Sequence, residues 1–191
     1  MGKLVRVSSQ QVAKARPRTL AEAAKATLAK AEGQGLLICD VSGSMDMRDA
    51  PGGKRRIDAL RDVVARLRQR FPALRVVAFS SQPMIASLAL PEPSGSTALH
   101  LALDFAAPMA RGMKAVCLIS DGEPDDPALA MAAARRFGRR IEVFYVGPEG
   151  GHGARFLASL AAATGGQYQQ ATLGQDLLEK AEKVLALPPG R

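Results

Sequence analysis

The sequence has no tryptophan, only two histidines and two cysteines, and aromatic residues make up 4% of its 191 residues. So few aromatic side chains disfavour a surface that binds nucleic acid by stacking bases. His100 and His152 are far apart in the chain, so they do not suggest a zinc site. Cys39 and Cys117 each lie in a short apolar run typical of a buried strand. We therefore expect two buried thiols and neither a redox pair nor a metal site at the cysteines.

Long hydrophobic runs are also missing. Charged residues interrupt every long segment, and no apolar run approaches the roughly 18 residues that a membrane-spanning helix requires. The opening residues, MGKLVRVSSQQ, lack the continuous apolar stretch of a secretory signal, and Arg6 stands where a myristoylation signal requires Ser or Thr. These features lead us to expect a soluble, cytoplasmic protein.

Positive charge is in excess but unevenly distributed. The net charge is +8, and residues 1–34 carry seven basic and two acidic side chains, a net +5 that leaves +3 for all other residues. We predict a basic N-terminal arm over residues 1–34, a domain over residues 35–187 and a tail over residues 188–191. A capping pattern at Thr19 and Glu22 predicts a helix within the arm. The arm is expected to be a solvated or docking helix, and nucleic-acid contact through it is an alternative.

After the arm, short apolar runs alternate with longer segments of helical periodicity, which is typical of a sheet covered by helices on both faces. Six strands are predicted, over residues 36–40, 75–80, 84–88, 115–120, 141–146 and 167–171. Five helices are predicted, over residues 56–70, 98–110, 126–139, 154–164 and 174–187. The connection before the third strand is too short for a crossover, so that strand should be an antiparallel edge strand. The fold class is therefore α/β, with a doubly wound, mostly parallel six-stranded sheet of Rossmann-like type.

Oxygen-bearing side chains follow the first predicted strand, in the segment DVSGS. Asp40, Ser42 and Ser44 alternate there, and side chains two apart in an extended segment point the same way. The segments SGSTAL (94–99) and ISDGEPDD (119–126) should reach the same edge of the sheet and add Thr97 and Asp121. An all-oxygen shell with two carboxylates suits a hard divalent cation, above all Mg²⁺.

These residues resemble the metal ion-dependent adhesion site (MIDAS) of von Willebrand factor type A (vWA) domains. DVSGS matches the family's D-x-S-x-S motif, Thr97 its single threonine, and Asp121 its distal aspartate, and the resemblance covers about residues 35–187. It implies that Ser42, Ser44 and Thr97 touch the ion, while Asp40 and Asp121 bind it directly or through water. It also implies that an acidic side chain of a partner completes the coordination, with Mn²⁺ or Ca²⁺ as alternative ions.

The function predicted from this resemblance is an intracellular, Mg²⁺-dependent protein-binding module that recognises an exposed Asp or Glu. Similar stand-alone domains often act as adaptors for AAA+ ATPases or other large complexes. Lys54, Arg55 and Arg56 begin a predicted helix, where positive charge is slightly unfavourable for the helix dipole. One hypothesis is that these three residues attract the acidic partner and that Glu123 assists at the site. The alternative is that all four are ordinary solvated residues.

A metal-dependent hydrolase is the competing interpretation, because an Asp after an apolar strand also begins the haloacid dehalogenase-type phosphatases. Those enzymes have D-x-D, whereas the second position here is Ser42, which lacks the carboxylate that serves as acid and base. The sequence contains neither a Walker-type phosphate loop nor a G-x-S-x-G nucleophile elbow. We therefore predict that the chain is not an enzyme.

Overall fold

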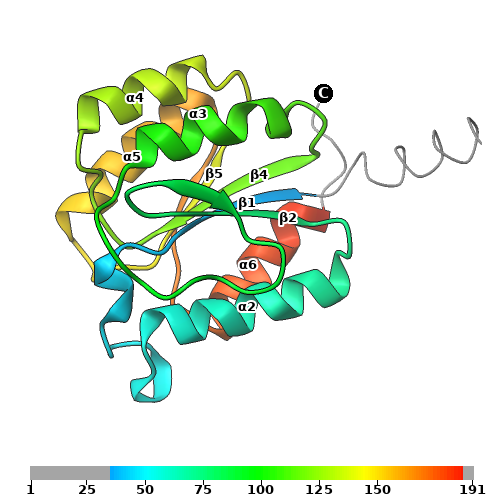
Figure 1. Ribbon diagram of the computed structural model, residues 1–191, viewed down its shortest axis with the longest axis vertical. Helices are drawn as coiled ribbons and strands as arrows, with labels where there is room; N and C mark the ends of the chain where they lie inside the picture. Colours follow the sequence, from blue (N-terminus) through cyan, green and yellow to red (C-terminus); the bar gives the residue numbers. More distant parts are fainter. Residues whose placement is uncertain (1–34, 187–191) are drawn as a thin grey trace, which may run out of the picture.

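A sheet of six strands between two layers of helices makes up the part of the chain that the computed structural model describes, residues 35–186 (Figure 1). The strand order is β3-β2-β1-β4-β5-β6. Every neighbouring pair is parallel except β2 and β3, which are antiparallel. This confirms the predicted fold class, including the antiparallel edge strand. The predicted helix of the basic arm and the tail lie outside the described residues.

The strands follow the short apolar runs of the sequence closely. Their bounds are Gly35–Asp40 (β1), Arg75–Phe79 (β2), Pro83–Ile85 (β3), Ala115–Ser120 (β4), Glu142–Tyr145 (β5) and Tyr168–Gln170 (β6). β1 and β4 are the two central strands, and all residues of β1 are buried. Burial on both faces explains why β1 reads as a continuous apolar run rather than an alternating one.

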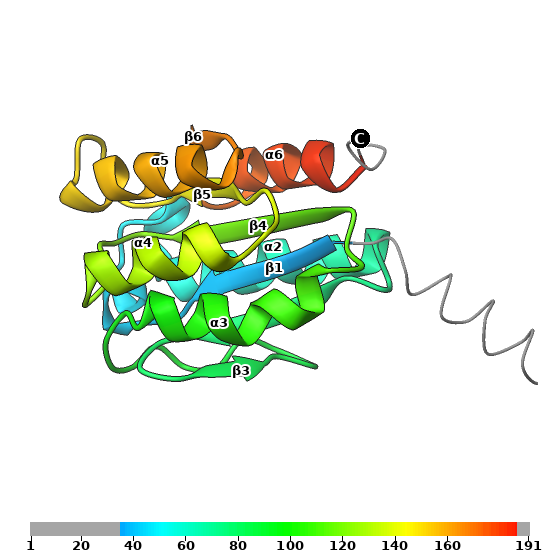
Figure 2. The ribbon, with the colours of Figure 1, turned by 90° about the horizontal axis from the view of Figure 1, so that it is seen from above.

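The helices lie on both faces of the sheet. Their bounds are Arg56–Arg70 (α2), Leu99–Ala110 (α3), Pro127–Arg136 (α4), His152–Thr164 (α5) and Gln175–Ala186 (α6). Two short 3₁₀ turns, Gly43–Asp46 (η1) and Pro51–Gly53 (η2), lie between β1 and α2. Figure 1 places α2 and α6 on one face, and α3, α4 and α5 on the other. Figure 2 shows the same layers from above.

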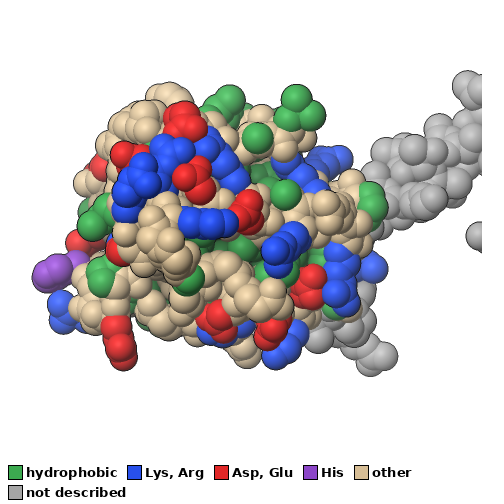
Figure 3. All heavy atoms as spheres, turned by 90° about the horizontal axis from the view of Figure 1, so that it is seen from below, with side chains coloured by type: hydrophobic (Ala, Val, Ile, Leu, Met, Phe, Trp, Pro, Cys, Tyr) green, Lys and Arg blue, Asp and Glu red, His purple; other side chains and the backbone are tan. Residues whose placement is uncertain are grey.

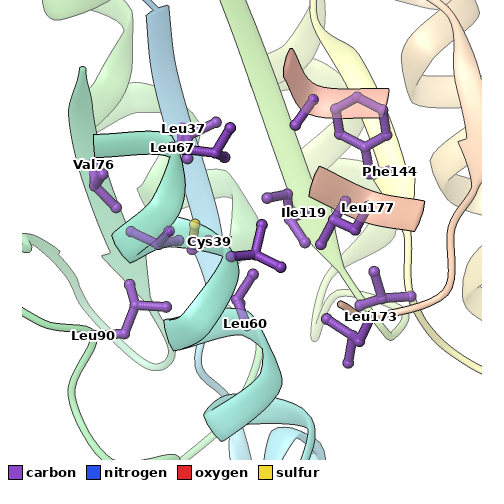
Figure 4. Close-up of a cluster of buried hydrophobic side chains, with 14 of the residues drawn as sticks. Leu37, Cys39, Leu60, Leu67, Val76, Leu90, Ile119, Phe144, Leu173 and Leu177 are labelled. Atoms are coloured by element: carbon purple, nitrogen blue, oxygen red, sulfur yellow. The ribbon is translucent and has the colours of Figure 1, made fainter. Parts of the chain in front are cut away.

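The buried side chains form two clusters, one on each face of the sheet. Successive residues of β1 alternate between them: Leu37 and Cys39 face α2 and α6, whereas Leu36 and Ile38 face the opposite layer. Figure 4 shows the first cluster, in which side chains of α2, including Leu60, meet those of the central strands. Cys39 and Cys117 are both buried and free, so the described structure agrees with two buried thiols.

Several elements are shorter than the periodicity predicts, and β3 and α4 show two causes. β3 covers three residues because the chain leaves the sheet after Ala86, whose carbonyl, like that of Leu88, accepts a hydrogen bond from the Arg68 guanidinium of α2. Leu88 itself is 91% exposed. α4 ends before Gly138, which has a positive φ of 71° and cannot continue the helix. Tertiary hydrogen bonds and a single glycine therefore set boundaries that apolar spacing does not show.

The loops that follow β1 and β4 meet at the carboxyl edge of the sheet, on the left-hand side of Figure 1. Because β1 and β4 are adjacent and parallel, Asp40 and Ser120 at their ends are neighbours. Within residues 35–186, no helix has the length and apolar character needed to cross a membrane.

Candidate functional site

Asp40 is the fully buried base of the site. It is the last residue of β1, and both of its carboxylate oxygens accept hydrogen bonds. The Ser42 backbone N–H donates to Oδ1 at 2.8 Å, and the Ser120 hydroxyl donates to Oδ2 at 2.6 Å. A backbone N–H of the loop after β1 and a hydroxyl at the end of β4 thus fix the orientation of this carboxylate.

A row of oxygen atoms leads from the first loop to the third. The hydroxyls of Ser42 and Ser44 are 3.2 Å apart, and the Ser44 hydroxyl donates to Asp121 Oδ1 at 2.8 Å. The 3₁₀ turn η1 begins directly after Ser42 and brings the two serines to the same side. Four of the five predicted ligands, Asp40, Ser42, Ser44 and Asp121, are therefore brought together.

Thr97, the fifth predicted ligand, has no hydrogen bond to the other four, but backbone hydrogen bonds join its loop to both of theirs. The N–H of Gly43 donates to the carbonyl of Gly95 at 3.1 Å, which ties the second loop to the first. The N–H of Thr97 donates to Asp125 Oδ1 at 2.9 Å, and the N–H of Asp125 donates to the Thr97 carbonyl at 3.1 Å. The second loop is thus held between the other two, with Thr97 half-buried.

Arg56 lies inside the site, whereas the sequence suggested a charge directed at a partner. Its side chain is only 4% exposed, and Nη1 donates to Asp121 Oδ2 at 2.5 Å. Nε donates to Asp49 Oδ1 at 2.7 Å, and Nη2 contacts the other oxygen of Asp49. The guanidinium turns inward because two carboxylates, one of them buried, lie on that side of the start of α2.

The other residues proposed for partner contact lie at the rim. Lys54 pairs with Asp62 at 2.9 Å, and Arg55 bonds to Asp46, Asp58 and Glu92. Figure 3, viewed from the side on which α2 lies, shows basic and acidic side chains interleaved over this face. Glu123, in the loop after β4, is exposed. Their part in partner binding stays a prediction.

Burial and charge both act on Asp40. The pKa of Asp40 is raised from the ordinary value of 3.8 to about 6, mainly by burial and next by the nearby Asp121, while the bonds from Ser120 and Ser42 oppose the rise. Outside the cluster, the Arg56 guanidinium holds the pKa of Asp49 below its usual range. A positive charge near Asp40 would relieve the cost of keeping this buried carboxylate ionised.

The donor set fits a hard divalent cation. All five side chains offer oxygen, and only two of them are carboxylates. With two carboxylates, the group is too small to count as a cluster of three or more His, Cys, Asp or Glu side chains able to hold a metal, and residues 35–186 contain no such cluster. Asp121 already forms an ion pair with a cationic group, because Nη1 of the Arg56 guanidinium lies 2.5 Å from its Oδ2. Positive charge is therefore what this group of oxygens stabilises.

Two supporting residues, Ser120 and Gly153, escaped the sequence analysis, and a third, Arg56, was assigned there to the partner instead of the site. Ser120 and Arg56 bond to the two carboxylates across 80 and 65 residues of sequence, so no local spacing signals them. Gly153, at the start of α5, lies against the loop of Asp121: a Cβ atom there would stand 2.5 Å from the carbonyl carbon of Gly122. The one signal for Ser120 in the sequence was that it is a polar residue at the end of an apolar run, the run that forms β4 beside β1.

Comparisons with known proteins identify the fold. Neither a family model nor a curated protein matches the sequence. Among solved structures, a von Willebrand factor type A protein from Catenulispora acidiphila is 20% identical with a TM-score of 0.64, over 81% of this chain and 43% of its own. BatB from Bacteroides thetaiotaomicron is 17% identical with a TM-score of 0.60, over 80% and 96%. Manganese-loaded TRAP from Plasmodium vivax is 18% identical with a TM-score of 0.56, over 81% and 72%.

At these identities the likeness concerns the fold alone. The neighbours include vWA proteins, and the mostly parallel six-stranded sheet with its antiparallel edge strand is the arrangement described above. The described domain therefore has a vWA fold.

Proposed function

We propose that the chain is a divalent-metal-dependent protein-binding module in which Asp40, Ser42, Ser44, Thr97 and Asp121 hold Mg²⁺. The observation that carries this proposal is the hydrogen-bonded row from Ser42 through Ser44 to Asp121, which joins oxygen atoms of residues 77 positions apart in the sequence. Two hydroxyls and a carboxylate in mutual contact, beside a second, buried carboxylate, form the all-oxygen donor set that Mg²⁺ prefers. Mn²⁺ or Ca²⁺ are alternative ions for the same donors.

The residues of the site have distinct tasks in this proposal. A bound dication would supply a positive centre that attracts a partner's carboxylate, because three of its five proposed ligands are neutral hydroxyls that cancel none of its charge. Asp40 is buried and held by Ser42 and Ser120, so it anchors the base of the site. Ser44 is exposed and Thr97 half-buried, so the partner approaches on their side.

The partner in this proposal is a protein that presents an exposed Asp or Glu. Lys54 and Arg55, at the rim, are bonded to acidic side chains of the chain itself, and in this proposal they exchange those pairs for pairs with the partner's acidic surface. The resemblance to vWA domains suggests an AAA+ ATPase or another large complex as the partner, and a cytoplasmic setting. Both belong to the proposal and rest on that resemblance.

Binding without catalysis is part of the same proposal. Both oxygens of Asp40 and both oxygens of Asp121 accept hydrogen bonds from groups of the chain itself. As proposed ligands, both carboxylates would also be held ionised by the cation, which makes them poor bases for taking a proton from a water or a substrate. This supports an adhesive role over a hydrolytic one.

The proposal is tested by affinity capture with matched variants. The wild type, Asp40→Asn and Asp62→Asn are each immobilised and exposed to lysate in Mg²⁺ or in EDTA. Asp62 is a suitable control because its substitution makes the same charge change at an exposed side chain of α2. We expect partners retained by the wild type and Asp62→Asn in Mg²⁺, and lost in EDTA or with Asp40→Asn. Capture that is the same in all six conditions contradicts the proposal.

A further inference from the structure

The guanidinium of Arg56 is shared between two carboxylates. One is Asp121, whose side chain is fully buried and which is a predicted metal ligand. The other is Asp49, whose side chain is 49% exposed and which lies in the loop between η1 and η2. Arg56 gives one nitrogen to Asp121 and two to Asp49. It is therefore a cation with one contact on the metal site and a stronger, two-point anchor outside it.

Both oxygens of Asp121 are engaged in this arrangement. The Ser44 hydroxyl donates to Oδ1 at 2.8 Å and Arg56 donates to Oδ2 at 2.5 Å. A dication that binds Asp121 must share this carboxylate with a guanidinium at hydrogen-bond distance. Because like charges repel strongly at such short range in a poorly solvated site, the two cations disfavour each other.

The backbone of Arg56 is held firmly, and its side chain already has two bonds to a second carboxylate. The Arg56 N–H donates to the Met47 carbonyl at 2.9 Å, and the next residue, Ile57, is buried in the core. Loss of the single bond to Asp121 leaves both bonds to Asp49, so Arg56 can release Asp121 by a side-chain shift, with no movement of α2.

We propose that Arg56 and the divalent metal are competing occupants of Asp121, so that Arg56 neutralises the site when it holds no metal, and gives up Asp121 and keeps only Asp49 when metal binds. This inference rests on the proposed metal site and adds its regulation. Asp49 is then a positioning residue that helps metal binding by holding Arg56 once it has left Asp121. The opposing view, in which Arg56 only orients Asp121 for the metal, makes the opposite prediction for the removal of Arg56.

Calorimetric titration of Mg²⁺ and Mn²⁺ into the full chain distinguishes these views. Arg56→Gln should bind metal about tenfold or more tightly than the wild type, because the competing charge is gone. Arg61→Gln, a neighbouring charge on α2 that pairs with Asp58 and Glu92, should bind like the wild type. Equal or weaker binding by Arg56→Gln overturns the inference while the metal site stands. Absence of binding in all three overturns both the inference and the proposed function.

Asp49 provides an independent test that retains Arg56. Asp49→Asn should weaken metal binding severalfold, whereas Asp46→Asn, an exposed acid on η1, should change it little. The double variant Arg56→Gln with Asp49→Asn should bind as tightly as Arg56→Gln, because Asp49 acts only through Arg56. If Asp49→Asn weakens binding equally with and without Arg56, it acts as a simple negative charge and the competition is refuted.

A spectroscopic readout covers the case in which Arg56→Gln fails to fold. In ¹⁵N-labelled wild type, the Arg56 Nε–H signal should shift on addition of Mg²⁺, and Asp49→Asn should alter that shift. An Arg56 signal that stays in place while Mg²⁺ binds contradicts the proposal.

Discussion

Asp40→Asn should stabilise the metal-free chain at neutral pH while it destroys metal binding. Asp40 is fully buried, and its pKa is raised from 3.8 to about 6, mainly by burial. The amide of Asn keeps both hydrogen bonds of the carboxylate, because its oxygen accepts from the Ser42 N–H and its NH₂ donates to the Ser120 hydroxyl. The substitution therefore removes a buried charge without leaving a polar group unpaired.

The magnitude follows from the raised pKa. Between about pH 4 and pH 6 the folded chain keeps a proton on Asp40 that the unfolded chain has lost, so the free energy of unfolding falls as the pH rises. Above pH 6 the full free-energy cost of the buried charge on Asp40 is present, and about two pKa units correspond to at most about 3 kcal/mol. Below pH 4 both states are protonated and the cost disappears. The advantage of Asp40→Asn should therefore grow from near zero at pH 4 to a maximum above pH 6.

Urea unfolding in EDTA, at several pH values between 4 and 7.5, measures this difference directly. Asp62→Asn is the control for net charge, because Asp62 is exposed. Saturating Mg²⁺ should stabilise the wild type and leave Asp40→Asn unchanged, since only the wild type binds it. If Asp40→Asn is less stable than the wild type at pH 7.5 in EDTA, the charge on Asp40 does not destabilise the folded chain and the reasoning is refuted.

Three further predictions concern the loop of Asp121, the thiols and catalysis. Gly153→Ala should weaken Mg²⁺ binding in calorimetry, because its Cβ would displace Gly122 beside Asp121; unchanged affinity contradicts this. Burial raises the pKa of Cys39 to about 12 and that of Cys117 as well, so iodoacetamide at pH 8 should label neither thiol until urea unfolds the chain. Labelling of the folded chain counts against a buried location. Generic phosphatase substrates should show no Mg²⁺-dependent turnover, and measurable turnover would favour the hydrolase.

The fold was largely predictable because burial leaves a direct mark on the sequence. β4 and α2 have the predicted bounds, since a short apolar run marks the strand and apolar residues at helical spacing, from Ile57 to Leu67, mark the helix. The relative directions of the strands follow from the fact that a short connection forces an antiparallel pair, whereas helical connections give parallel ones. The end of β3 was not predictable, because it depends on Arg68, a residue of another element.

The proximity of the candidate site residues was predictable, but their electrostatics were not. Asp40, Ser42 and Ser44 lie within one short motif, and spacing of two residues is enough to group them. The pairing of Arg56 with Asp121 depends on how α2 approaches the loop after β4, which no periodicity records. Sequence alone therefore describes Arg56 as one of three basic residues at a helix start, and only the structure distinguishes it from Lys54 and Arg55.

The central claim is that three loops form one cation site, and paramagnetic NMR of the full ¹⁵N-labelled chain tests it most directly. Substoichiometric Mn²⁺ should first broaden the amide signals of residues 40–44, 96–98 and 121–122, and excess Mg²⁺ should restore them. Broadening confined to exposed rim acids such as Asp46 and Glu92, or no selective broadening at all, would contradict the account.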